Sequence, residues 1–287
     1  MRRIGAWLLV VGLVAACGGD GRTVERESIA DATSSSTSVE APPSPTSAIP
    51  TPTTLATTPR PDWLGTRVLP LRDDGLGQIQ PTPDELVDRR FATVDLLPPP
   101  EADGFRSTVA PVPDDVVARS TWSNACPVDR SDLRYVNVVF WGFEGLAHTG
   151  ELLVHVDAVD AVVAGFDHLF ARRFPIEEMR ITRADELDVP PTGDGNNTSA
   201  FVCRPSVGST TWSQHAYGRA VDINPFHNPY VRGDVVIPEL ASSYAARPDL
   251  PGVLGGDDVA GFTSAGWGWG GTWRSSKDHM HLSSTGS

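Results

Sequence analysis

The chain has 287 residues, a formal net charge of −13 and only three cysteines. This acidic balance leaves no basic stripe to neutralise phosphates, so the composition argues against a nucleic-acid partner. The length allows one large or two small domains, although part of the chain is too poor in apolar residues to form a core.

The first 17 residues are typical of an export signal. Two arginines precede an apolar run over residues 4–16, which is too short to span a membrane. The ending "VAAC" resembles the lipobox of bacterial lipoproteins, in which the Cys, here Cys17, is lipidated after cleavage. The sequence thus predicts an exported protein that acyl chains anchor to the cell membrane, facing the cell wall. A plain signal peptide with a chance Cys is the alternative.

Two segments of low apolar content follow the signal. Residues 18–62 consist largely of Ser, Thr and Pro and are expected to form a disordered, extended stalk. Residues 63–118 are rich in Pro and Asp with short apolar pieces, which indicates a loosely structured lead-in that packs on the next domain. We therefore expect the main folded domain over residues 119–287.

The folded domain begins with patterns of both strand and helix. Residues 134–143, "RYVNVVFWGF", are β-branched and aromatic, and residues 148–158 hold a second apolar run, so the two predict a hairpin. Apolar residues then recur at helical spacing between 159 and 170, and Pro175 ends the helix. Residues 177–182 are a short strand candidate. This order predicts an α+β fold with a small antiparallel β-sheet and flanking helices.

Two cysteines remain after Cys17, namely Cys126 and Cys203. In an exported chain an isolated pair of this kind predicts one disulfide. It would close a loop of roughly 77 residues and stabilise the fold by about 4 kcal/mol in the chain-entropy model.

The stretch "SQHAYGRAVDIN" contains a His and an Asp that suit a metal. Val221 and Ile223 alternate with Asp222, so the carboxylate lies on the strand face opposite its apolar neighbours. Gly218 permits a turn that returns His215 towards that face. A neutral imidazole and a carboxylate are good zinc ligands, but a hydrogen-bonded His–Asp pair near a turn explains this stretch equally well.

A second stretch near the end of the chain, "KDHMHL", supplies the missing groups. Met280 and Leu282 alternate with His279 and His281, so a strand would bury the first two and direct the histidines into a cleft. Three protein ligands and an open position form a catalytic zinc site, and a nearby carboxylate, Asp278, serves as general base. The alternation of a strand directs both histidines to the same face, so it does not decide which of them is the metal ligand.

Together these stretches resemble a known peptidase family. "SQHAYGRAVDINPFHNPYV" is similar to the SxHxxGxAxD motif of the M15 zinc peptidases, which include D-alanyl-D-alanine carboxypeptidases and peptidoglycan endopeptidases. "WGGTWRSSKDHMH" resembles the closing motif of that family, and "NNTSAFVCR" resembles a segment upstream of the first ligand. The resemblance covers roughly residues 120–282 and implies the zinc peptidase (hedgehog-like) fold of the family.

The resemblance also implies a role for individual residues. His215, Asp222 and His281 correspond to the ligands of one zinc ion, and Asp278 corresponds to the carboxylate that moves a proton from the attacking water to the leaving amine. Arg204 is the candidate for the family's substrate-binding arginine, although the usual Tyr-Arg-Ser surroundings are replaced by "FVCR". His279 also departs from the family, which usually has an aromatic or apolar residue there.

The leading hypothesis is therefore a monomeric, lipid-anchored zinc peptidase that acts on peptidoglycan stem peptides. Trp269 is a candidate to line the substrate groove, although core packing is an equal explanation for any Trp of the "WGWGGTW" run. The alternative function is a non-catalytic wall-binding module that keeps the M15 fold. The sequence does not separate cleavage of D-Ala-D-Ala from cleavage of L-Ala-D-Glu.

Overall fold

The structure is a computed structural model that describes residues 54–287. The predicted signal peptide, the lipidated Cys17 and residues 18–53 of the predicted stalk lie outside the described residues. Within residues 54–287 no helix is both long enough and apolar enough to cross a bilayer.

An antiparallel hairpin forms the centre of one sheet. β2 (Leu133–Trp141) pairs along its whole length with β3 (Ala147–His155), which confirms the predicted hairpin. β1 (Ser107–Pro111) pairs antiparallel with the other edge of β2. Side chains of β2 and β3 that are fully buried, such as Val136 and Leu152, make this sheet one wall of the main core.

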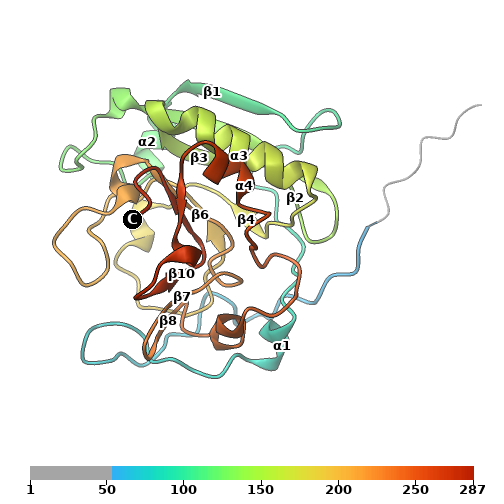
Figure 1. Ribbon diagram of the computed structural model, residues 1–287, viewed down its shortest axis with the longest axis vertical. Helices are drawn as coiled ribbons and strands as arrows, with labels where there is room; N and C mark the ends of the chain where they lie inside the picture. The colour runs from blue at the N-terminus through green and yellow to red at the C-terminus, as the bar shows by residue number, and fades with distance from the viewer. Residues whose placement is uncertain (1–53) are drawn as a thin grey trace, which may run out of the picture. The chain divides into compact units, whose positions relative to one another are not determined.

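Two helices pack beside this sheet (Figure 1). α3 (Val159–Ala171) buries Val162, Phe166 and Leu169, the residues at the predicted helical spacing. α4 (Ala260–Ser264) lies against α3, where the missing side chain of Gly165 makes room for the ring of Phe262. The predicted strand over 148–158 ends earlier, since residues 156–158 form a 3-10 turn.

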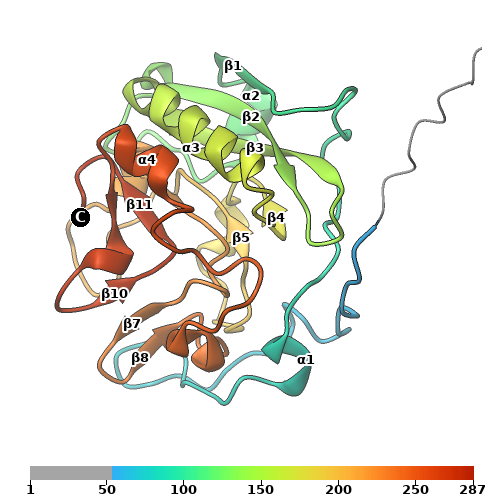
Figure 2. The same cartoon turned by 45° about the vertical axis from the view of Figure 1, so that its right-hand side comes forward.

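Two further three-stranded antiparallel sheets hold the two histidine- and aspartate-containing motifs of the C-terminal half in place. One has the order β6–β11–β9, with β6 (Ala220–Asp222), β11 (His281–Ser283) and β9 (Gly268–Trp269). The other has the order β10–β7–β8, with β10 (Lys277–Asp278), β7 (Tyr230–Arg232) and β8 (Val235–Ile237). In Figure 2 the short β10 lies between β11 and the β7–β8 hairpin.

The strand predicted over residues 177–182 is shorter than expected. Only β4 (Glu178–Met179) forms, and it pairs parallel with β5 (Asn197–Thr198). The ladder stops because the next amide, Arg180 N, donates to the Asn197 side chain instead of to a strand carbonyl. The remaining elements are short: α1 (Asp84–Val87), α2 (Asp114–Arg119), η1 (Arg130–Asp132), η2 (Val156–Ala158), η3 (Ala184–Glu186), η4 (Gln214–Tyr217), η5 (Ser242–Ala246) and η6 (Gly270–Thr272). Small antiparallel sheets with few helices confirm the α+β class.

The segment before the hairpin packs closely on the rest of the protein. Leu69, Leu86 and Phe91 are buried in a second apolar cluster with Phe226 and Tyr244. Ordered contacts begin within the end of the predicted stalk, where the Leu55 amide donates to the Glu144 carbonyl at 2.7 Å. Residues 54–118 thus contribute core side chains as well as strand β1.

Cys126 and Cys203 form a disulfide with an S–S distance of 2.06 Å, as the cysteine count predicted. Both half-cystines pack against a third apolar cluster that contains Val128 and Phe201. The bridge therefore ties the loop before β2 to the segment just before Arg204.

Candidate metal centre and active site

A tight turn brings the first candidate ligand to the metal centre. The Ser213 hydroxyl accepts from the His215 amide at the start of η4. The turn ends at Gly218, whose φ of 67° lies in the left-handed region. A Cβ on Gly218 would also approach the His155 amide nitrogen to 2.7 Å, so this turn requires glycine for two reasons.

Strand register supplies the other two candidate ligands. β11 pairs antiparallel with β6 so that His281 lies directly opposite Asp222. Directly opposite residues of an antiparallel pair project from the same face of the sheet. His281 and Asp222 are thereby neighbours although 59 residues separate them in the chain.

The three side chains form a triangle of metal-binding groups, in which the two imidazole nitrogens face different oxygens of the Asp222 carboxylate. His215 Nε2 lies 3.2 Å from His281 Nδ1 and 3.2 Å from Asp222 Oδ2, and His281 Nδ1 lies 3.2 Å from Asp222 Oδ1. Ligand atoms at tetrahedral zinc, with bonds of about 2.0–2.1 Å, are roughly 3.3 Å apart. Two imidazoles and a carboxylate at this spacing fit zinc in both chemistry and geometry.

The segment just before the disulfide orients two of these ligands. The Ala200 carbonyl lies 2.5 Å from His215 Nδ1, so Nδ1–H donates to it and the lone pair of Nε2 points to the centre of the triangle. Ser199 and Asp222 exchange two backbone hydrogen bonds, of 2.9 and 3.1 Å. Residues 199 and 200 therefore set the orientation of one His ring and the position of the carboxylate strand.

The Asp222 carboxyl is held in its ionised form. Burial raises its pKa, but the charges and hydrogen bonds of His215 and His281 outweigh burial and hold the pKa well below the usual range. An anionic carboxylate between two imidazoles is the state that a metal cation requires.

The pKa of Asp278 shifts in the opposite direction. Burial, followed by the negative charge of Asp222, raises its pKa to about 7, and the positive charges of His281 and Arg204 oppose this rise. Its Oδ1 atom is buried and has no hydrogen-bond partner among the described residues. A buried carboxyl oxygen without a partner is uncommon in folded proteins, and together with the raised pKa it is typical of a functional group.

Arg204 lies at the edge of the same site. It is half-buried, its Nη1 donates to the Pro205 carbonyl at 3.2 Å, and its charge acts on Asp278. The neighbouring Cys203 is fixed by the disulfide, and the substrate-binding role of Arg204 stays a prediction.

His281, and not His279, lies in the triangle of donor atoms. The predicted single strand over 279–282 begins only at His281, because His279 donates its amide to the Pro229 carbonyl beside the other sheet. The His279 ring lies 6.2 Å from the ring of Trp269. Burial, followed by the charges of Arg247 and Lys277, lowers the pKa of His279 to about 4.

Trp269, which was predicted to line the substrate groove, makes contacts within the protein. Its indole N–H donates to the His279 carbonyl at 2.8 Å, and its ring packs against the main core. Trp273 is the tryptophan beside the metal centre, with its ring centroid 5.7 Å from that of His281. Composition alone did not separate these tryptophans, since each lies in the same Gly/Trp run.

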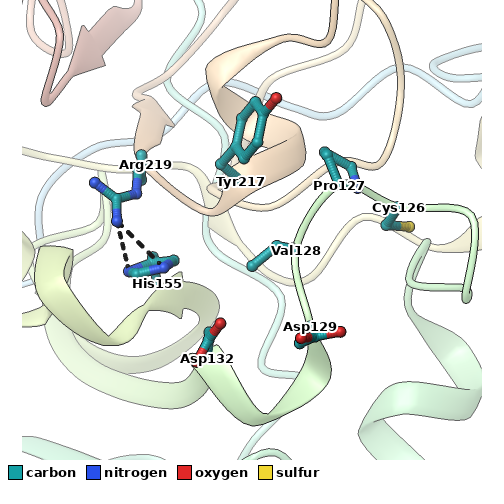
Figure 3. A pocket seen from close by; sticks show the side chains of 8 residues that line it. All are labelled: Cys126, Pro127, Val128, Asp129, Asp132, His155, Tyr217 and Arg219. Atoms are coloured by element: carbon teal, nitrogen blue, oxygen red, sulfur yellow. Dashed lines mark hydrogen bonds between the residues drawn. The ribbon is translucent and has the colours of Figure 1, made fainter.

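A separate pocket of about 360 Å³ lies beside the η4 turn (Figure 3). Tyr217 and Arg219, which lie between two candidate ligands in the chain, line it together with His155 and residues 126–132. Arg219 donates to the His155 ring at 3.3 Å and forms a 2.8 Å ion pair with Asp157. The lining includes no member of the donor triangle, so this pocket is distinct from the metal centre.

Comparison with known proteins finds a relationship for the part of the chain that holds this site. Residues 207–284 match the model of an M15 peptidase family described as D-alanyl-D-alanine carboxypeptidase. This segment is similar to M15 peptidases. The match includes all three candidate ligands and Asp278, and it supports a peptidase, while the rest of the chain lies outside it. No curated protein and no solved structure matches the chain.

Proposed function

We propose that this protein is a zinc-dependent peptidase that hydrolyses peptidoglycan stem peptides. The observation that carries the proposal is the triangle of His215, Asp222 and His281, with contacts of 3.2 Å, together with the buried Asp278 Oδ1 atom, which has no hydrogen-bond partner among residues 54–287. The similarity of residues 207–284 to M15 peptidases supports it. The bond cleaved is D-Ala-D-Ala in a carboxypeptidase or L-Ala-D-Glu in an endopeptidase, and the fold is that of the DD-peptidases.

The three triangle residues would hold one zinc ion through His215 Nε2, an Asp222 carboxylate oxygen and His281 Nδ1. When bound, zinc polarises a carbonyl group and lowers the pKa of water to about 7. The Ala200 carbonyl keeps the proton of His215 on Nδ1, so Nε2 is available for the metal without a change of tautomer.

Asp278 is the general base and then the general acid. As a carboxylate it takes a proton from the attacking water, and it then passes this proton to the amine of the leaving residue. Its pKa of about 7 in the metal-free protein lies near neutral pH, where both proton transfers are possible. A cation beside Asp278 favours its carboxylate form, which is the form that accepts a proton from the attacking water.

Arg204 binds negative charge on the substrate. Its positive charge acts on Asp278, and we assign it to the scissile carbonyl oxygen, which gains negative charge in the transition state. A planar guanidinium is also suited to a carboxylate of the substrate.

The same proposal places the enzyme outside the cell as a monomer. The export signal and Cys17 in the "VAAC" stretch favour a lipid anchor on the cell membrane, with the site facing the cell wall. Membrane fractionation of cells that express Cys17→Ser checks the anchor, because an unlipidated chain should leave the membrane fraction.

Metal analysis and muropeptide digestion of the full chain test the function. We expect about one zinc per chain, and His215→Ala should lose both the zinc and the cleavage of muropeptides. Asp278→Asn should keep the zinc and lose roughly 10²- to 10⁴-fold in turnover, the usual contribution of a general base. His168→Ala is the matched control, because this His bonds to the Asp257 carbonyl away from the site.

The outcomes separate the rival functions. Full zinc content in His215→Ala would contradict the ligand assignment. Intact muropeptides in the presence of zinc-loaded wild-type protein would favour the non-catalytic wall-binding module.

A further inference from the structure

A row of three side chains crosses the sheet that contains the proposed base. In the order β10–β7–β8, Asp278 lies directly opposite Tyr230, and Tyr230 lies directly opposite Ile237. Residues that are directly opposite in antiparallel pairs project from the same face of a sheet. The three side chains therefore form one continuous row that starts at the base and leads away from the metal centre.

The face that carries this row is the face of the active site. As the proposed general base, Asp278 projects towards the metal centre, and its position in β10 opposite Tyr230 fixes which face of the sheet this is. Tyr230 and Ile237 follow it on the same face, and both are half-buried. A tyrosine side chain is longer than an aspartate side chain, so a hydroxyl at position 230 reaches further from its own strand than the carboxyl group at position 278.

The Tyr230 hydroxyl is free to bind a ligand. Within residues 54–287 it has no hydrogen-bond partner, and it is not among the buried atoms that lack one. The other tyrosine hydroxyls near buried groups are occupied: Tyr135 donates to Glu151 at 2.7 Å, and Tyr244 accepts from the Arg89 amide at 3.0 Å. Tyr230 thus offers an unused donor in line with the base.

The chemistry of the base assigns this row to one side of the scissile bond. Asp278 must reach the amine that leaves, because it returns the proton there. Groups that continue the row beyond Asp278 therefore flank the leaving residue, whereas Arg204 and the donor triangle serve the scissile carbonyl. This assignment rests on the proposed peptidase function.

We propose that Tyr230 donates a hydrogen bond to the main-chain oxygen of the leaving residue and that Ile237 packs against its side chain. The oxygen belongs to a carboxylate when the leaving residue is terminal and to a carbonyl when the peptide continues. The apolar Ile237 at the end of the row selects a leaving residue with an uncharged, apolar side chain.

Tyr230→Phe tests the hydrogen bond in the full chain. On the muropeptide that the wild type cleaves, we expect kcat/KM to fall roughly 10- to 100-fold, as for loss of a hydrogen bond to a charged or polarised group. Inhibition by the released product should weaken by a similar factor, while zinc content and melting temperature stay at wild-type values. Tyr217→Phe is the matched control, since its side chain lines the separate pocket of Figure 3.

Ile237→Ala tests the second contact by substrate preference. The ratio of kcat/KM for an alanine and a glycine leaving residue should fall towards one, because the apolar contact with the methyl group is lost.

A wild-type enzyme that cleaves muropeptides while Tyr230→Phe stays within twofold of it in both kcat/KM and product inhibition would overturn this assignment and leave the proposed function standing. An inactive wild type would instead refute the function. Loss of zinc in Tyr230→Phe would show a structural role in place of substrate contact.

Discussion

Two aspartates in one site have opposite protonation chemistry because their neighbours differ. Asp222 contacts two imidazoles at 3.2 Å, and these hold its pKa below the usual range. Asp278 is buried, its Oδ1 has no hydrogen-bond partner in the part of the chain that the structure describes, and the negative charge of Asp222 acts on it, so its pKa rises to about 7. A metal ligand must stay ionised, as Asp222 does, whereas a general base must exchange protons near neutral pH, as the pKa of Asp278 allows.

The raised pKa of Asp278 predicts how the stability of the metal-free protein depends on pH. Between the ordinary pKa of 3.8 and the folded-state value of about 7, the folded protein holds a proton that the unfolded chain has released. The contribution of this group to stability is therefore complete below pH 3.8 and is lost as the pH rises through 7. Asp278→Asn should remove that loss.

Thermal unfolding of the chelator-treated protein measures the effect. Asp278→Asn should melt at a higher temperature than the wild type at pH 8 and at nearly the same temperature at pH 4. Equal differences at both pH values would show that Asp278 ionises normally in the folded state.

At the scale of elements, the short turn η6 sets the position of β10. A Cβ built on Gly270 would lie 2.8 Å from the Asp278 Cβ and 2.5 Å from the Asp278 carbonyl oxygen, so only glycine allows the two segments to approach. A side chain at this position must push β10, and with it the base, away from η6.

Gly270→Ala should therefore impair catalysis more than metal binding. We expect turnover to fall at least about tenfold, because displacement of a catalytic group by about 1 Å is costly, while the zinc content remains near one per chain. Gly256→Ala is the matched control, since nothing lies within 4 Å of its Cβ position and its φ is not positive. Wild-type turnover in Gly270→Ala would show that β10 tolerates the contact.

At the scale of the whole described molecule, the lead-in segment is joined to the domain by a buried ion pair. Arg89 donates to both carboxylate oxygens of Glu177, at 2.7 and 2.8 Å, and the two side chains are 2% and 1% exposed. Asn196 also donates to Glu177 at 2.7 Å, and Arg89 donates to the Asp194 carbonyl. Residues before the hairpin therefore satisfy a charge in the interior of the domain.

Removal of the arginine should destabilise the entire fold. Arg89→Leu removes the buried counter-charge of Glu177 and leaves only the more exposed Arg60, 3.5 Å away, as a cationic partner, which costs about 3–5 kcal/mol of unfolding free energy. Arg183→Leu, which breaks an exposed pair with Asp185, should cost less than about 1 kcal/mol. Urea denaturation of both variants measures the difference, and equal losses would show that the buried pair contributes no more than the exposed one.

Local patterns were sufficient to predict the hairpin, helix α3 and the disulfide. The hairpin follows from the β-branched, aromatic and apolar composition of two nearby segments, and the helix follows from helical spacing. The pairing of Cys126 with Cys203 follows from the count of cysteines. The short pair β4 and β5 was not predictable in this way, because a hydrogen bond from the Arg180 amide to the Asn197 side chain ends it.

The sequence by itself determined which chemical groups are available to the site: two imidazoles, two carboxylates and an arginine in motifs that resemble one peptidase family. Only the tertiary structure decided which of them meet. The register of β11 on β6 places His281, and not His279, opposite Asp222, and the register of β10 on β7 aligns Asp278 with Tyr230. These registers join segments about 50 to 60 residues apart, and a shift of one residue would turn each side chain to the other face, so no local pattern specifies them.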